Sequence, residues 1–194
     1  TFFSLIHGDT ALIDNVPAGI IPNMSYRRAG GDVEGRTIKT NILVTSSKTT
    51  VIVDYSTWRY SKKLYLNTTA SGANVAGNVT DFPVLIRLIS SNFDFRQAEA
   101  NGEDVRFAKS DGTPLAFEIE RWDAAAQRAE IWVKLDTVYG NDSMQSITMY
   151  WGNPNAADES NGAAVFDTAS GFTAVWHLNS GCSDITAGNH DGTN

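Results

Sequence analysis

The sequence predicts an all-β protein whose main part is an antiparallel β-sandwich of the jelly-roll type. Two observations lead to this prediction. Residues 55–154 hold six or more short strand-like runs separated by turns rich in Gly, Asn, Asp and Ser, a spacing typical of β-sandwiches. In addition, residues 115–135 alternate between apolar and polar side chains with a period of two, which indicates half-buried strands.

Residues 1–54 are expected to form a separate set of short strands. Strand-like runs lie at 2–6, 10–13, 20–27 and 49–53, and turn-forming sequences break them. The stretches LIDNVPAGIIPNMSY and IKTNILVTSSKTTVIVD, which end at Tyr26 and Asp54, together resemble the end of a carboxypeptidase-regulatory-like domain. The resemblance implies that residues 1–54 are a partial Ig/prealbumin-like strand set, holding only the last strands of such a domain.

The main sandwich is expected over residues 55–154, where short elements follow one another closely. We expect one helical turn within 92–101 and strands near 59–66, 82–89, 102–107, 115–122, 129–135 and 146–151. Turns are expected where Gly, Asn, Asp and Ser gather, at 67–81, 109–113 and 139–142, and the last strand stops at the turn 152–154.

The alternating stretch 115–135 predicts a hairpin with one apolar and one polar face. The apolar face takes Leu115, Phe117, Ile119, Ile131, Val133 and Leu135, and the polar face takes Glu118, Glu120, Trp122, Glu130, Trp132 and Lys134. Directly opposed residues of an antiparallel pair share a face. The simplest register therefore sets Trp122 across from Glu130, Glu120 across from Trp132, and Glu118 across from Lys134.

The polar face of this hairpin is the candidate ligand-binding site. An indole face packs on sugar C–H groups while carboxylates accept hydrogen bonds from hydroxyls, so this combination suits a glycan. Asp104 and Arg106 alternate in the same way and could join the face. The candidate residues are Trp122, Trp132, Glu118, Glu120, Asp104 and Arg106.

A second interpretation of the same face is structural, and the usual behaviour of aromatic residues favours it. Another strand or loop would then cover both tryptophans. Glu118 and Lys134 would form a cross-strand ion pair, and Arg106 would pair with Glu118 or Glu120 in a charge network.

No catalytic residue is assigned to the hairpin. Glu118-Ile119-Glu120 resembles the E-I-D-x-x-E strand of concanavalin A-like glucanases, whose carboxyls act on the glycosidic bond. Glu120 replaces the Asp of that motif, and Trp122 and Asp123 stand where its third acid is expected. This broken spacing argues against a glycosidase.

No metal or cofactor is expected either. The loops lack a D-x-D-x-D sequence, which favours ordinary solvated carboxylates over a calcium site. The three histidines lack zinc-ligand spacing and have no Ser or Cys partner for a triad. The residues considered in these two tests are Asp94, Glu103, Asp104 and Asp111 for calcium, and His7, His177 and His190 for zinc or a triad.

Composition excludes several classes of partner. The net charge is −7 at pH 7 and no Lys/Arg cluster occurs, so nucleic acid is not an expected partner. No apolar run approaches the roughly 20 residues of a membrane-spanning helix, and we expect that this chain does not span a membrane. Cys182 is the only cysteine, which rules out an intrachain disulfide and a cysteine-pair metal site.

A series of motifs across residues 58–154 resembles a bacterial family known only as a domain of unknown function. The motifs are W-x-Y-x-K-K, DFPVLIRL, NFDF, GEDVRF, FEIERWD, IWVKL and MYWGNP, in that order. Members of this family occur in envelope proteins beside LamG (concanavalin A-like) lectin domains, and as extracytoplasmic parts of MotA/TolQ/ExbB proton-channel-type proteins. The resemblance implies an extracytoplasmic location, in the periplasm or at the cell surface, and no established chemistry.

Residues 172–194 resemble the opening of a LamG-type domain. The sequence FTAVWHL, followed by Asp184, Thr186 and the run GNHDGT, carries this resemblance. Residues 155–171 are expected to be an exposed linker between the two domains. The chain also begins at Thr1 without a signal-peptide pattern, and we expect it to be an internal piece of a longer protein.

These observations favour a non-enzymatic extracytoplasmic module of a multidomain bacterial envelope protein. The expected role is adhesion or carbohydrate binding, with a glycan or another envelope protein as partner. The alternative is a structural or sensor domain of a proton-channel-type membrane complex, and a glycoside hydrolase is the third hypothesis.

Overall fold

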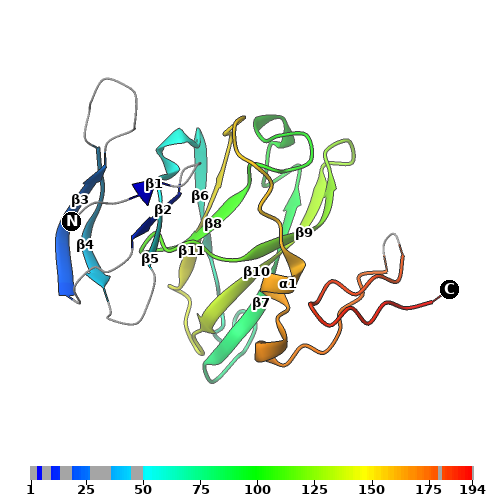
Figure 1. Cartoon of the computed structure of the whole chain (residues 1–194). Helices are drawn as coiled ribbons and strands as arrows, with labels where there is room; N and C mark the ends of the chain where they lie inside the picture. The colour runs from blue at the N-terminus through cyan, green and yellow to red at the C-terminus, as the bar shows by residue number, and fades with distance from the viewer. Residues whose placement is uncertain are drawn as a thin grey trace. The chain divides into compact units, whose positions relative to one another are not determined.

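The computed structural model describes residues 4–5, 10–13, 19–26, 36–44, 50–178 and 181–193. The chain divides into two compact units, Thr1–Tyr55 and Ser56–Asn194 (Figure 1). In the first unit, the antiparallel strands β1 (Ser4–Leu5), β2 (Thr10–Ile13) and β5 (Thr50–Val53) form one sheet in the order β1-β2-β5, and β3 (Gly19–Tyr26) pairs with β4 (Arg36–Val44). The turn-forming sequences expected between these strands lie at 7–9, 14–19 and 30–31, and apart from Gly19 they are outside the described residues.

The second unit is a sandwich of two antiparallel sheets, which confirms the predicted all-β class. One sheet has the order β7-β10-β9, formed by Val79–Ile89, Arg128–Val138 and Phe117–Asp123. The other has the order β6-β11-β8, formed by Tyr60–Tyr65, Ser146–Trp151 and Arg106–Lys109. Short helical turns connect or follow the strands: η1 (Tyr55–Thr57), η2 (Phe95–Gln97), α1 (Gly162–Val165) and η3 (Thr168–Ser170).

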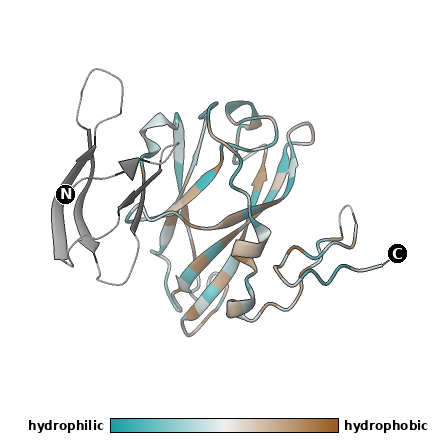
Figure 2. Ribbon diagram, viewed as in Figure 1, coloured by the Kyte–Doolittle hydropathy of each residue, from teal (hydrophilic) through white to brown (hydrophobic). Residues whose placement is uncertain are grey.

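The core lies between the two sheets and uses alternate residues of their central strands. In β10 the buried residues are Ala129, Ile131, Val133 and Leu135, and in β11 they are Ile147, Met149 and Trp151. The same alternation appears as brown and teal bands along the strands in Figure 2. Because side chains alternate between faces of a strand, this pattern forces one face of each sheet inward. The predicted apolar face of the hairpin is confirmed.

The predicted register of the hairpin is wrong: Glu118 pairs with Trp132 instead of Lys134, and beyond Ile119 a β-bulge in β9 shifts the pairing by one residue. Ile131 pairs with Ile119, but the next residue of β10, Glu130, pairs with Arg121. Glu120 is therefore an extra residue in β9. A bulge of this kind reverses the side-chain alternation of everything that follows it.

Trp122 consequently turns to the core instead of the polar face. It pairs with Ala129 and packs against Phe93 and Phe95, with ring centroids 5.8 and 5.2 Å away. The Trp122 indole N–H is buried and finds no acceptor among the described residues. Gly102 has a φ of +77° beneath the indole, where an added Cβ would lie 2.6 Å from the ring. The bulge thus adds a large aromatic ring to the core.

We expect Ile131→Ala to lower the free energy of unfolding by roughly 2–5 kcal/mol, because it leaves a cavity at a fully buried position. Denaturant unfolding followed by circular dichroism measures this loss. Ile89→Ala is the matched control, since Ile89 is 45% exposed and its truncation should change stability by no more than about 0.5 kcal/mol. Equal losses in the two variants would contradict the assigned core.

Candidate functional site

The outer face of the β7-β10-β9 sheet holds the polar residues that the bulge leaves there. Glu118, Trp132 and Lys134 lie on it, together with Glu120 at the bulge. Residues 155–178, which we call the covering segment, lie across this face. Its helix α1 contacts β9 and β10, as the orange part of the ribbon in Figure 1 shows.

The covering segment first attaches to the free edge of β9. The N–H of Asn161 donates to the carbonyl of Phe117 at 2.8 Å, and the N–H of Ile119 donates to Ser160 Oγ at 2.8 Å. These bonds satisfy backbone groups that an edge strand would otherwise present unpaired. The segment therefore takes the place of a further strand over this part of β9.

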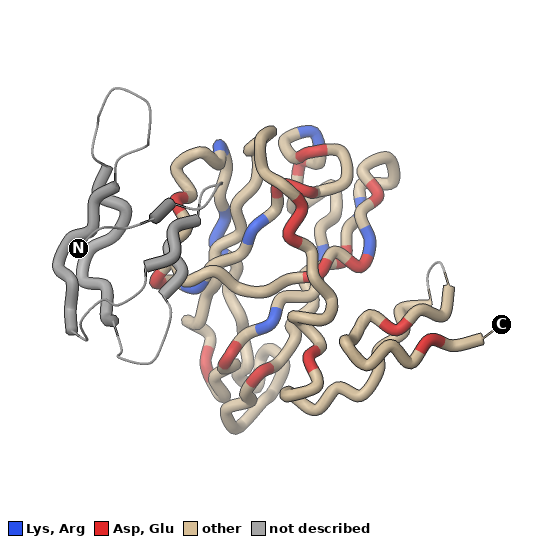
Figure 3. The backbone as a smooth tube through the Cα atoms, in the orientation of Figure 1, with Lys and Arg blue, Asp and Glu red and all other residues tan. Residues whose placement is uncertain are grey.

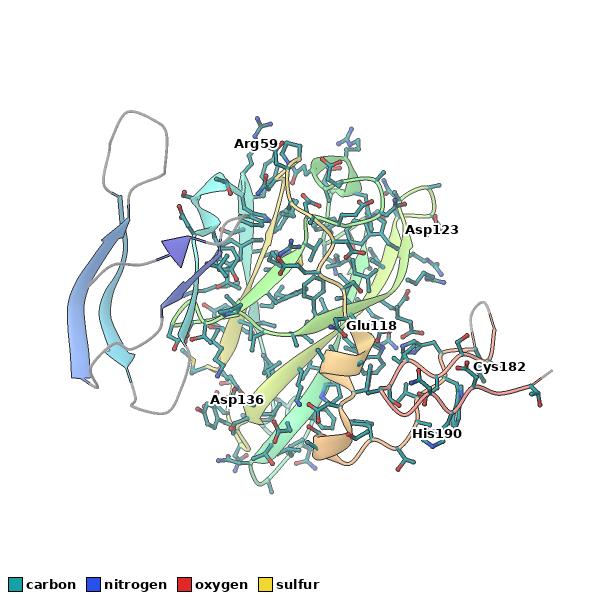
Figure 4. The ribbon with its side chains drawn as sticks, in the orientation of Figure 1. Arg59, Glu118, Asp123, Asp136, Cys182 and His190 are labelled. Carbon is teal, nitrogen blue, oxygen red and sulfur yellow. The ribbon has the colours of Figure 1, made fainter. Side chains whose placement is uncertain are left out.

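The first turn of the segment then passes closely over Glu118. Asn161 caps α1, its side-chain oxygen accepting from the N–H of Ala164 at 3.0 Å. Gly162 follows at a point where an added Cβ would lie 2.8 Å from Glu118 Oε1. Figure 4 shows Glu118 next to this helix. A side chain at this position would displace the Glu118 carboxylate, because the backbone runs directly over it.

Aromatic packing covers the tryptophan of the face. Phe166 is buried and meets the Trp132 ring edge to face at 5.6 Å between centroids. Phe172 packs against Phe166 in the same way, at 5.2 Å between centroids. Val165, the last residue of α1, is fully buried. Offset and edge-to-face aromatic contacts of this kind stabilise packing beyond the area they bury. Trp132 is therefore part of a small second core.

His177 lies between the two glutamates at the centre of the face. Its Nε2 is 3.0 Å from Glu118 Oε2, and its Nδ1 is 3.5 Å from Glu120 Oε2. Glu120 Oε2 also accepts a hydrogen bond from the Trp132 indole at 2.6 Å. The Glu118 and His177 side chains are only 10% and 12% exposed. Burial raises the pKa of Glu118, and the hydrogen bond with His177 opposes that rise without cancelling it.

Lys134 forms the second polar attachment of the segment. Its ammonium pairs with Asp167 of the covering segment and donates to Ser170 Oγ at 2.8 Å, while Asp81 of β7 is 3.9 Å away. The hydrogen bonds from Lys134 and Ser170 lower the pKa of Asp167 to about 2. An ionised Asp167 is therefore part of the attached arrangement.

A buried carboxylate, Asp184, organises the residues that follow the segment. It accepts the N–H groups of Val175, Thr186 and His190 at 3.0, 3.0 and 2.8 Å, and the hydroxyl of Thr186 at 2.9 Å. Burial disfavours the charge of Asp184, but these donors outweigh it and hold its pKa well below the usual range. Asp184 thereby links residues 173–177 to residues 184–190.

The structure separates Asp104 and Arg106 from the polar face. Asp104 is fully buried and accepts the N–H groups of Glu99, Gly152 and Asn153 at 2.9, 2.5 and 3.2 Å. The expectation that Asp104 joins the hairpin face or is an ordinary solvated loop acid is wrong. Asp104 instead ties the loop that follows η2 to the turn that follows β11.

Arg106 fastens the start of the covering segment. Its guanidinium donates to the carbonyl of Ala157 at 2.5 Å and pairs with Glu159 at 3.0 Å, over the Trp58 ring. The predicted pairing of Arg106 with Glu118 or Glu120 is wrong, because β8 belongs to the other sheet. The other predicted ion pair, Glu118 with Lys134, is also wrong, since β10 sets Trp132 opposite Glu118.

Sequence reasoning missed three residues that build this site: Phe166, Asp167 and His177. Phe166 and Asp167 fall in the expected linker, and His177 in the expected start of the next domain. No local pattern identifies them, because their partners are far away in the chain; Glu118 and His177 are separated by 59 positions.

Three further features of the described residues bear on function: metal-binding groups, the distribution of charge and membrane-spanning helices. Among the residues that the structure describes, no group of three or more His, Cys, Asp or Glu side chains could hold a metal ion. Acidic and basic residues are interspersed along the described part of the second unit (Figure 3). In that same part of the chain, no helix has the length and apolar character needed to cross a membrane.

Part of the chain matches a known protein family. Residues 101–179 match the family model described as "Domain of unknown function (DUF2341)". This supports the resemblance to a family known only as a domain of unknown function. The matched range runs past the expected boundary at residue 154 and takes in the covering segment with His177. No curated protein and no solved structure matches the chain.

Replacing Asp104 by Ala should cost roughly 3 kcal/mol of unfolding free energy, because three backbone N–H groups lose a charged acceptor in the interior. Asp104→Asn keeps one acceptor oxygen and should cost less. Chemical denaturation of the two variants measures the difference. A loss for Asp104→Ala no larger than for Asp111→Ala, which removes an exposed acceptor of the Thr113 N–H, would contradict this role.

We expect acid to weaken attachment of the covering segment through Asp167. Because the pKa of Asp167 is lowered to about 2, its contribution is complete above about pH 4, the usual range for Asp, and is lost as the pH falls towards 2. The NMR signal of the Trp132 indole N–H reports the attachment. Asp167→Asn should flatten the acid response. Asp136→Asn is the control, because it removes an ion pair with Lys109 away from the segment, and it should leave the acid response unchanged. A similar acid response in the unmodified protein and both variants would contradict the assignment.

Proposed function

We propose that residues 56–178 form a non-enzymatic structural module of an extracytoplasmic, multidomain envelope protein. The module's task is to hold the chain that follows it firmly against the sandwich. One observation supports this proposal above all: the polar face that the sequence offers as a ligand site is occupied by the chain's own residues 160–177.

The attachment combines several kinds of buried and specific contact. It combines backbone bonds along the β9 edge, a buried aromatic cluster around Phe166, the ion pair of Lys134 with Asp167, and His177 between two glutamates. Paired and hydrogen-bonded charges tolerate burial, whereas isolated ones do not. An arrangement with each polar group partnered supports a load-carrying connection between successive parts of a protein.

Adhesion or carbohydrate binding at this face fits the structure less well. A glycan platform needs an open aromatic ring with free hydrogen-bonding groups beside it. Trp132 lies under Phe166, Trp122 belongs to the core, and the Glu118 side chain is 10% exposed. The same cover opposes a glycosidase, because a catalytic carboxyl must reach the substrate. The non-enzymatic proposal rests on this lack of access.

The extracytoplasmic location is part of the proposal through the family resemblance. That resemblance implies either an envelope protein with lectin-type neighbours or a proton-channel-type complex as the setting. A structural role is compatible with either setting, and it makes the spacer hypothesis the leading one.

If the module holds the following chain, residues 181–193 should tumble together with the sandwich in solution. Phe166→Ala removes the centre of the aromatic contact and should let these residues move independently. Backbone ¹⁵N relaxation on the full chain measures the change. Phe82→Ala is the matched control, since Phe82 is 48% exposed and lies outside the segment. Independent motion of residues 181–193 already in the unmodified protein would overturn the proposal.

A polysaccharide array tests the competing role directly. The unmodified chain should show no retention. Binding to a glycan that is lost in Trp132→Phe would instead favour recognition at this face.

A further inference from the structure

His177 joins the covering segment to the sheet through both of its ring nitrogens. Nε2 faces Glu118 and Nδ1 faces Glu120, at 3.0 and 3.5 Å. A protonated imidazole donates from both nitrogens, whereas the neutral ring donates from only one. When the ring is neutral, its second nitrogen presents a lone pair to a carboxylate. The geometry therefore suits the charged ring.

The other charged groups on this face are already engaged. On β10, Lys134 is paired with Asp167 of the segment and approached by Asp81 of β7. Glu130 pairs with Arg121 of β9 at 2.7 Å. From the segment, Phe166 lies against His177 with ring centroids 6.0 Å apart. The described ion pairs thus leave His177 as the cation that faces Glu118 and Glu120.

We propose that His177 is a pH-dependent latch, which keeps the covering segment attached while its imidazole is protonated and lets the segment detach as the pH rises. The proposal rests on the proposed function, because it regulates the same attachment. Release accompanies the loss of one ring proton, because only the charged ring donates to both carboxylates.

Glu118 also weakens the attachment of the covering segment as the pH rises. Burial raises its pKa, so the attached state binds a proton more readily than the detached state does. A group with a raised pKa stabilises the attached state at low pH and loses that contribution as the pH rises through the raised value. Together with the loss of the Asp167 contribution at acid pH, this weakens the attachment on both sides of an intermediate pH.

Chymotrypsin cleavage after Phe166 tests the latch on the full chain. Phe166 is 5% exposed, so cleavage requires detachment. The rate at each pH is divided by the rate for a peptide that spans the same bond, which removes the pH dependence of the protease. From pH 5.5 to pH 8.5 the normalised rate should rise about fivefold, within the limit of tenfold per pH unit for one linked proton.

Three variants separate the possible causes. His177→Gln keeps a donor that does not titrate and should reduce the rise to the part that Glu118 contributes, and Glu118→Gln should reduce the rise to the part that His177 contributes. His190→Gln is the control, because His190 lies near Asp184 with a side chain 56% exposed, and it should retain the full rise. Circular dichroism confirms that each sandwich is folded.

The outcomes distinguish the two proposals. A normalised rate that is low and constant with pH, or a rise in His177→Gln as large as in the unmodified protein, would overturn the latch and leave the structural role standing. Cleavage as fast as in the peptide at every pH would show that the segment is not attached, and it would overturn both.

Discussion

The extra residue in β9, Glu120, sets the composition of both faces of the β7-β10-β9 sheet. Because β9 gains one residue on β10 at this point, Trp122 turns inward and joins Phe93 and Phe95. The same bulge lets Glu120 accept a hydrogen bond from Trp132 and places it 3.5 Å from His177 Nδ1. Without it, strict alternation would place two tryptophans on the outer face and leave the core short of an aromatic ring.

The covering segment is the second consequence of this sheet. A face that carries Trp132 and Glu118 is neither apolar enough to be buried like a core nor polar enough to be left open. The segment meets both needs, because Phe166 covers the indole while His177 and Asp167 partner the charges. Buried polar groups are tolerated only when they are fully partnered. The specificity of the attachment therefore comes from its polar contacts and its area from the aromatic ones.

The sequence predicts the local features of this fold well, because they are repeated over neighbouring residues. Alternation identified the strands and the inward face of β10, and clusters of Gly, Asn, Asp and Ser identified the turns. Alternation failed at the bulge, since one irregular residue has no periodic signature. It also failed for Arg106 and His177, whose partners Glu159 and Glu118 are distant in the chain. The interpretation that another segment covers the tryptophans agrees with the structure for Trp132, whereas Trp122 packs in the core. The partners of Trp132 could be found only from the tertiary arrangement.

The bonds from Ser160 and Asn161 to β9 have a meaning beyond attachment. A bare edge strand is a template for pairing with other chains, and natural proteins protect such edges with charges, bulges or cover. Here Glu120 supplies a bulge, and the segment occupies the backbone groups of Phe117 and Ile119. The segment thus also protects β9 from edge-to-edge aggregation. A homologous protein without the segment would need other protection of this edge, such as charged residues on β9.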